Sequence, residues 1–220
     1  MEYKIVRSKR KTIALQINSN MEVVVKAPFG VSDFYIDELV QKRKKWIIEK
    51  VGIVGRRKDK MIFKKYEEGE EFLFLGKRYK MEVDGNQKEK VWLGETLRVK
   101  NILKAKDLVI KWYKKEALDY FADRVCEIAR DFGYEYGKVM ISNAKKRWGT
   151  CNFRNDIRIN WRLIMAPSEV IDYVILHELV HTKIKNHSKK FWMAVKLAMP
   201  EYKHQEKWIK DNRFELMSLE

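Results

Sequence analysis

The residues best suited to chemistry are the five from His177 to His181, which read His-Glu-Leu-Val-His. In a helix, residues four apart lie on one face, a turn above each other, so two imidazoles can hold one metal ion. Glu178 would then lie beside the metal, where a carboxylate can take a proton from a water on that ion. Shuffled chains of this composition would contain the pattern only about once in 150, so it indicates a metal site.

The helix that carries these residues is expected to be buried. Pro167 suits its first turn, Ser168 suits its cap, and Glu169 suits the positive end of the helix dipole. From Val170 to Val180 nearly every residue is apolar, which is typical of a helix enclosed on all sides. Buried imidazoles and carboxylates are costly unless they are paired or bind a metal. The surroundings therefore favour a metal site.

A catalytic zinc usually has three protein ligands and one open position. His187 follows His181 at the spacing that metzincins use, but the glycine that lets their chain turn is missing. Asn186 is the residue best able to make that turn here, since asparagine tolerates the left-handed region. A downstream glutamate, as in gluzincins, and the remaining histidine are the alternatives: Glu201, Glu206, Glu215 and His204. Cys151 as a fourth ligand would instead close the site and make the zinc structural.

The elements before this helix are predicted from hydrophobic periodicity and turn residues. The first part of the chain should form three strands, with a hairpin turn at Asn18-Ser19-Asn20, and then a helix capped by Ser32 that runs to about Lys50. A basic connector is expected over 52–60. Four further short runs predict an antiparallel sheet or partly open barrel. The predicted strands are 3–7, 12–17, 22–26, 71–75, 78–83, 91–93 and 97–99.

A long amphipathic helix is expected over 104–131, with Gly133 as its C-cap. Its apolar stripe is predicted to comprise Leu108, Trp112, Leu118, Phe121, Ala122, Val125, Ile128, Ala129 and Phe132. A strand at 139–142, a basic loop over 145–151 and a half-exposed edge strand at 157–160 should follow it. After the metal-site helix, Ser188 should cap a helix that ends near Pro200. The fold class is therefore α+β, with a β-rich lobe at 1–103 and a second domain at 104–220.

Composition narrows the classes of function. The chain has 220 residues, 45% of them hydrophobic, which is typical of a globular protein. It contains no apolar run long enough for a membrane span and no signal peptide, and Cys126 and Cys151 suggest no disulfide framework, so a cytoplasmic protein is expected. The net charge of +16 favours anionic partners, DNA or RNA above all, although a lysine-rich surface can also be a general preference.

Three stretches carry a family resemblance: RWGTC at 147–151, IRINWRLIMAPSEVIDYVILHELVH at 157–181, and NHSKKFW at 186–192. Together with SKRKTIALQI, APFGVSDFYIDEL and FLGKRYKMEV earlier in the chain, they make the sequence resemble the YgjP-like metallopeptidases, relatives of the WLM and SprT-like groups. The resemblance implies a zincin-like fold, in which the metal-site helix packs against a small mixed or antiparallel sheet. It implies zinc held by His177, His181 and His187, with Glu178 as general base.

The expected activity is hydrolysis of peptide bonds in a protein or peptide substrate. An extended peptide could add to the predicted edge strand at 157–160. Candidates for contact with substrate are Arg147, Trp148 and Asn160, although packing within the loop explains them equally well, and Tyr173 and Tyr202 are candidates for stabilising an oxyanion. Relatives in the SprT-like and WLM groups act on proteins near or crosslinked to DNA, which suggests nucleic-acid-associated targets by analogy.

A different class of function competes with the peptidase. The chain could be a basic module that binds nucleic acid and uses zinc mainly to hold its fold. Four basic segments would then contact phosphates: Arg7–Lys11, Lys42–Lys45, Arg56–Lys60 and Lys145–Arg147. The two hypotheses differ in what metal removal does, since a structural zinc is needed for folding and a catalytic zinc is not.

Overall fold

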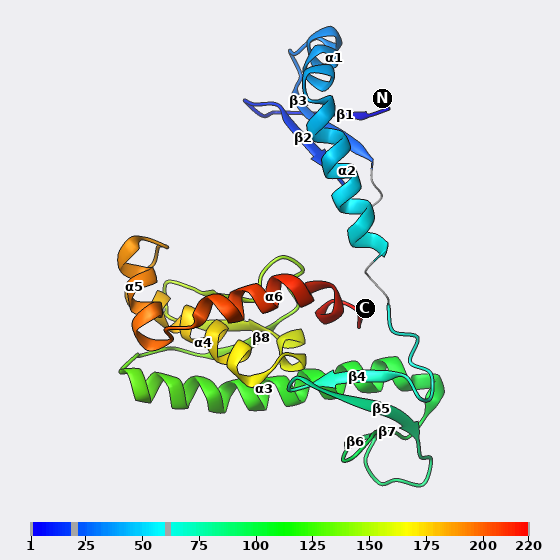
Figure 1. Cartoon of the computed structure of the whole chain (residues 1–220), viewed down its shortest axis with the longest axis vertical. Helices are drawn as coiled ribbons and strands as arrows, with labels where there is room; N and C mark the ends of the chain where they lie inside the picture. The colour runs from blue at the N-terminus through cyan, green and yellow to red at the C-terminus, as the bar shows by residue number, and fades with distance from the viewer. Residues whose placement is uncertain (1, 19–21, 60–62, 220) are drawn as a thin grey trace. The chain divides into compact units, whose positions relative to one another are not determined.

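The computed structural model describes residues 2–18, 22–59 and 63–219, and the chain divides into two compact units, Met1–Ile62 and Phe63–Glu220 (Figure 1). The domain boundary expected between 103 and 104 lies inside the second unit and stays a prediction. Together the units contain several small sheets and six helices among the described residues, which is a mixed α+β architecture. None of those helices is both long and apolar enough to cross a membrane.

The first unit is a three-stranded sheet with two helices. Strand β3 (Val23–Pro28) lies in the middle, parallel to β1 (Lys4–Ser8) and antiparallel to β2 (Ala14–Ile17). The predicted strands and hairpin are therefore confirmed, while residues 19 and 20 of the expected turn lie outside the described residues. The unit has its own small core: Val23, Val25, Ala27, Ile36, Val40 and Ile47.

The helical part of this unit differs from the prediction. Ser32 does cap the first helix, since its hydroxyl accepts a hydrogen bond from the Tyr35 N–H at 3.3 Å. The single helix expected up to Lys50 is instead two, α1 (Asp33–Lys42) and α2 (Lys44–Asp59), which divide at Arg43. The connector expected from residue 52 is helical up to residue 59. Glycine costs a helix only about 1 kcal/mol and the segment has no proline, so its arginines and lysines can continue the helix.

The second unit begins with a four-stranded sheet in the order β4-β5-β7-β6. Its strands are β4 (Glu71–Phe74), β5 (Lys77–Val83), β6 (Val91–Leu93) and β7 (Leu97–Val99). The strands were correctly placed, but the antiparallel sheet or barrel was wrong, because β5 and β7 run parallel. Strand β6 forms a hairpin with β7 and takes the outer position, which brings β7 beside β5 in the parallel sense.

Helix α3 (Ala105–Phe132) follows the short turn η1 (Ile102–Lys104) and ends at Gly133, whose φ of 65° is left-handed, as the predicted C-cap requires. The predicted apolar stripe is confirmed except at Leu118 and Phe132, which are exposed. In the first half, Tyr113 is fully buried and donates a 2.5 Å hydrogen bond to the Leu73 carbonyl. A tyrosine whose hydroxyl is hydrogen-bonded can take the place of an apolar residue in a core. Tyr113 was not part of the predicted apolar stripe.

Three short strands form the sheet nearest the histidine motif. Strand β10 (Ile157–Asn160) is central, parallel to β8 (Val139–Ser142) and antiparallel to β9 (Gly149–Cys151). The edge position predicted for 157–160 was therefore wrong, and part of the predicted loop at 145–151 is itself the edge strand. A three-residue strand that begins with glycine is too short to show alternation, so the pattern could not reveal it.

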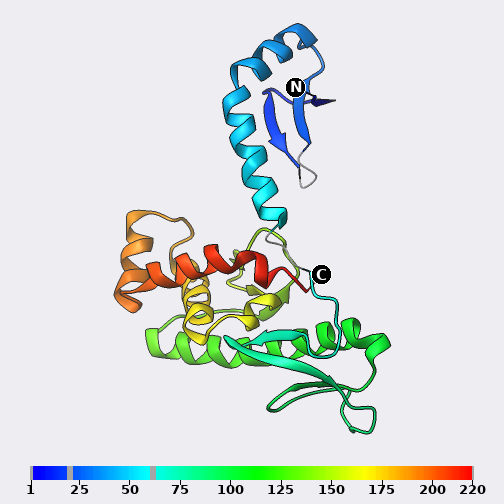
Figure 2. The ribbon, with the colours of Figure 1, turned by 45° about the vertical axis from the view of Figure 1, so that its right-hand side comes forward.

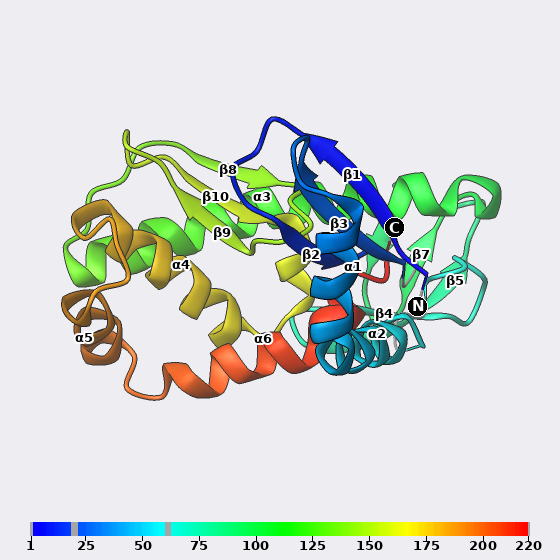
Figure 3. The ribbon, with the colours of Figure 1, turned by 90° about the horizontal axis from the view of Figure 1, so that it is seen from above.

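The histidine motif lies on α4 (Ser168–Lys183), which follows the turn η2 (Trp161–Met165). Pro167 occupies the N-cap, one residue before the predicted Ser168, and the helix is buried along most of its length, as expected. Helix α5 (Lys189–Ala198) starts after Ser188, and α6 (Tyr202–Leu216) completes the unit without having been predicted. Figure 3 shows α4 between the edge strand β9 and helices α5 and α6, and Figure 2 shows α3 running along the same unit.

Candidate metal centre

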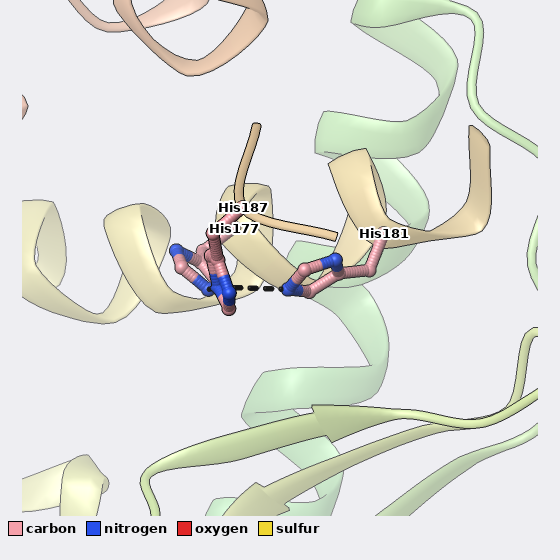
Figure 4. A group of neighbouring side chains, drawn as sticks. All are labelled: His177, His181 and His187. Atoms are coloured by element: carbon pink, nitrogen blue, oxygen red, sulfur yellow. Dashed lines mark hydrogen bonds between the residues drawn. The ribbon is translucent and has the colours of Figure 1, made fainter. Parts of the chain in front are cut away.

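Three histidine rings converge at the end of α4 (Figure 4). His177 and His181 are half-buried and one helical turn apart, and His187 comes from the exposed segment between α4 and α5. The Nε2 of His187 lies 2.9 Å from that of His177 and 3.1 Å from that of His181. Within the described part of the chain, their possible ligand atoms lie within 4.8 Å of one another. The structure therefore brings together the three histidines named from the sequence.

The donor atoms suit a divalent metal. Zinc–nitrogen bonds of about 2.0–2.1 Å in a tetrahedral site separate two ligand nitrogens by roughly 3.3–3.4 Å, so the 2.9 and 3.1 Å separations need to widen only slightly. The Nδ1 of His181 lies 2.9 Å from the Ile184 carbonyl, which assigns the proton to Nδ1 and leaves Nε2 free to bind. Burial lowers the pKa of His177 to about 3, helped by the neighbouring His181 and His187, so its ring is neutral, as a ligand must be.

Glu178 lies next to the first histidine and is only 5% exposed. Burial raises the pKa of its carboxyl to about 8. No hydrogen bond joins this carboxyl to another described residue, and its oxygens are not among the fully enclosed polar atoms, so they keep some access to solvent. A carboxyl that is buried, unpaired and adjacent to a metal-binding group is typical of an active site rather than of a core.

Gly149 of β9 makes room for this carboxyl. A Cβ atom built on Gly149 would lie 2.6 Å from Cγ and 2.8 Å from Cδ of Glu178, which is closer than real side chains approach. The edge strand therefore touches the acid directly, and only glycine permits that contact. Gly149 was predicted to lie in a loop, because its contact with Glu178 joins positions far apart in the chain.

The residues that were alternatives for the third metal ligand, and Cys151 as a fourth, form other interactions. Glu215 forms an ion pair with Arg78 at 2.6 Å, Glu206 pairs with Lys210 at 2.8 Å, and Glu201 lies 3.2 Å from His204. The half-buried thiol of Cys151 is 3.9 Å from the Lys185 ammonium, and burial raises its pKa. Among the described residues, only His187 joins His177 and His181 in the group.

An aromatic row forms one side of the centre, and only its two tyrosines were named from the sequence as site residues. Phe191 is buried, and its ring centroid lies 4.5 Å from that of His181 and 4.8 Å from those of the other two histidines. Trp192 stacks on His187, Tyr202 stacks on Trp192, and Tyr173 stacks on Tyr202. The two tyrosines named from the sequence therefore belong to the surroundings of the centre, and Tyr173 also meets His177 edge-on at 6.0 Å.

The remaining candidates lie around the start of β9. Asn160 is fully buried; its amide donates to the Ala144 and Arg147 carbonyls at 2.7 and 3.3 Å, and its oxygen accepts from the Arg162 N–H at 3.2 Å. It has no surface for a substrate and instead holds the loop before β9 in place. Trp148 is half-buried against the core, and Arg147 is exposed, so their contact with substrate stays a prediction.

Comparison with known proteins connects this centre to a family. No curated protein sequence matches the chain. Among solved structures, the metallopeptidase zymogens of Pyrococcus abyssi abylysin and Methanocaldococcus jannaschii jannalysin are similar to part of it, at 26% and 28% identity. They cover 42% of this chain and 93% and 95% of their own, with TM-scores of 0.39 and 0.38. The family model for the YgjP-like metallopeptidase domain matches residues 11–212, nearly the whole sequence, and the chain therefore belongs to the YgjP-like metallopeptidase family.

Proposed function

We propose that the second unit is a zincin-like zinc peptidase, in which His177, His181 and His187 hold the ion and Glu178 is the general base. The observation that carries this proposal is the buried Glu178, which no described residue pairs and which directly follows the first of three histidines whose ring nitrogens converge. Membership of the family implies a metallopeptidase that acts on a protein or peptide substrate. The choice of zinc rests on the three-histidine donor set, which suits that ion among others.

Zinc, when bound, acidifies a water and polarises a carbonyl oxygen. Glu178 supplies the proton transfers. Its carboxylate accepts a proton from the attacking water and passes it to the departing amine nitrogen. The nearby positive charge of a metal would favour the ionised form of a carboxyl whose pKa burial has raised.

An extended substrate can add to the edge strand β9. This strand takes the role that was predicted for 157–160, which is the central strand β10. Hydrogen bonds pair Asn152 with Asp156 at 3.1 Å and Asn160 with Trp148 at 2.7 Å. Because paired and unpaired positions alternate in an antiparallel ladder, the backbone groups of Gly149 and Cys151 point to the free edge. A peptide added there would run past Glu178.

The transition state needs a donor for the oxygen that becomes negative. Tyr173 fits this role because burial raises the pKa of its phenol, which keeps the hydroxyl protonated. Tyr202 stacks on it and is the second candidate. The variants Tyr173→Phe and Tyr202→Phe distinguish them, since loss of the donor lowers kcat by about a hundredfold and loss of ring packing alone does not.

The decisive experiment compares Glu178→Gln with the wild type. The variant should bind one zinc per chain and melt at the wild-type temperature, yet lose hydrolysis of casein by at least about a hundredfold. Metal analysis and release of labelled casein fragments give the two readouts. A wild type that binds zinc and cleaves no protein under any condition would remove the proposal.

A second candidate is a nucleic-acid-associated module, or a peptidase recruited to such targets. It is favoured by exposed basic side chains without ion pairs among the described residues, at Lys9, Lys11 and Lys42–Lys45. Arg7 counts against part of it, because it is held by Asp33 and by the Val31 carbonyl at 2.7 Å, and the side chains of Arg56–Lys60 lie outside the described residues. This candidate predicts affinity for DNA or RNA that falls steeply with salt.

A further inference from the structure

A cleft of about 370 Å³ lies in the first unit, between the edge of its sheet and its two helices. Its lining is apolar with one aromatic and one cationic side chain: Ile13, Leu15, Leu39, Arg43 and Trp46. Its volume is near the lower end of those that bind ligands in proteins. The proposed peptidase chemistry makes no use of it.

Strand β2 borders the cleft and is an edge strand, paired only with β3. The N–H of Asn18 donates to the Glu22 carbonyl at 3.0 Å, which identifies that pair as hydrogen-bonded. Alternation along the antiparallel ladder then makes the Leu15 and Ile17 pairs the unbonded ones, so their backbone N–H and C=O groups point outward. An incoming strand would find these groups ready to pair.

The two edges of this sheet are protected differently. Natural proteins guard exposed edges with charged residues or proline. Strand β1 carries Lys4 and Arg7, whereas β2 reads Ala-Leu-Gln-Ile and has neither a charge nor a proline. An apolar edge beside an apolar cleft is the arrangement that proteins use to bind an extended peptide by strand addition.

Charge selects the kind of peptide. Residues 1–62 hold 15 lysines and arginines against 7 aspartates and glutamates. Arg43 lines the cleft itself, its neighbours Lys44 and Lys45 are exposed, and Lys9 and Lys11 lie shortly before Ile13 in the chain. A second copy of this basic unit would be repelled, whereas an acidic segment would be attracted.

We propose that the first unit captures an extended acidic segment of the protein substrate, which adds antiparallel to β2. The side chain opposite Leu15 would point to the same face as Leu15 and enter the cleft. Acidic side chains two positions to either side share that face, where Arg43 can pair with one of them. That the partner is a substrate rests on the proposed function, but the binding itself needs neither Glu178 nor a metal. Holding one segment raises the effective concentration of the rest of the substrate.

A labelled peptide tests the inference on the full chain. The probe is a capped peptide in which threonine occupies every second position. The positions between the threonines are glutamate, valine and glutamate, in that order, so the valine and both glutamates lie on one face of the strand. Arg43→Glu should weaken its binding about tenfold. The matched control Lys50→Glu changes the same charge on an exposed α2 residue outside the cleft and should change affinity less than twofold. Methylation of the valine amide, which faces β2, should abolish binding, whereas methylation of the adjacent threonine amide should not.

Several results would overturn the inference. Equal losses in Arg43→Glu and Lys50→Glu would mean general charge attraction, and equal losses from the two methylated peptides would exclude strand addition. An oligothymidylate that binds more tightly and loses affinity in Arg43→Glu alone would assign the cleft to nucleic acid. Loss of peptide binding after zinc is removed with EDTA would place the peptide at the metal centre instead. Retained binding in the zinc-free protein supports the cleft, whatever happens to casein hydrolysis.

Discussion

The Glu178 carboxyl depends on a residue with no side chain. Because a methyl group on Gly149 would overlap Cγ and Cδ of Glu178, Gly149→Ala must displace the carboxyl or the strand β9. General bases lose most of their effect when they move by about an ångström. We expect casein hydrolysis to fall at least about a hundredfold, with zinc content unchanged.

Gly85→Ala provides the matched control for Gly149→Ala. A Cβ built on Gly85 meets nothing within 4 Å and its φ is not left-handed, so activity and melting temperature should stay at wild-type values. If Gly149→Ala keeps full activity, the carboxyl has more freedom than this contact allows, and its assignment as a positioned base is wrong.

Asp156 gives the turn between β9 and β10 a measurable dependence on pH. Its carboxylate accepts 2.9 Å hydrogen bonds from the Lys138 backbone N–H and the Asn152 amide, which lower its pKa below 3.8. A group with a lowered folded pKa stabilises the fold above its unfolded pKa, and that stability is lost as pH falls through the folded value. The wild type should melt above Asp156→Asn at pH 7, and the gap should stay nearly constant down to about pH 4 and narrow below it. A gap that does not narrow down to about pH 2 would show that the carboxylate charge is not involved.

The Lys185 side chain helps to hold the segment between α4 and α5. The Lys185 ammonium donates to the Asn152 carbonyl at 3.1 Å and to the Asn155 side-chain oxygen at 2.6 Å, which ties the segment to the turn after β9. His187 lies two residues further and is exposed, so it relies on this tie for its position. Lys185→Met should weaken zinc affinity about tenfold, as measured by competition with a chelating dye.

Lys196→Met is the control for this effect. Lys196 is exposed on α5, and no ion pair or hydrogen bond joins it to another described residue. Its substitution should leave zinc affinity unchanged. Equal losses in the two variants would mean that removing any nearby positive charge, and not the tie at Lys185, changes metal binding.

Elements with a long repeating pattern could be predicted, and elements defined by contacts could not. Helix α4 and the three histidines followed from an apolar run and from spacing within one stretch. Strand β9 did not, because three residues show no period and its partner β10 lies beyond a turn. The same reason explains why 157–160 was wrongly predicted to be an edge strand. The order of strands in a sheet depends on which strands pair, and a sequence pattern does not contain that information. Phe191 and Gly149 were missed as site residues because each meets the centre through space.

At the scale of the whole molecule, the described residues form two separate hydrophobic cores, one in each compact unit. Val25 is fully buried in the smaller core, and Val25→Ala should destabilise the first unit by about 2 kcal/mol through lost burial and a small cavity. The second unit should keep its melting transition, its zinc affinity and its casein activity. Calorimetry can follow both transitions, and an equal shift in the second would show that the two units unfold as one.

Metal removal separates a catalytic zinc from a structural one at the scale of the whole chain. The proposed ligands are two half-buried histidines and one exposed histidine, while the larger core includes buried residues of α3, α4, η2 and β10 that are not among them. A ligand present at a thousand times its dissociation constant stabilises a protein by about 4 kcal/mol, so chelation should lower the second melting transition by several degrees without unfolding the chain. Circular dichroism after treatment with EDTA should therefore match that of the zinc-loaded protein, and casein hydrolysis should return when zinc is restored. A chain that unfolds on chelation would instead favour the binding module with a structural zinc, because in such modules the metal supplies the folding free energy.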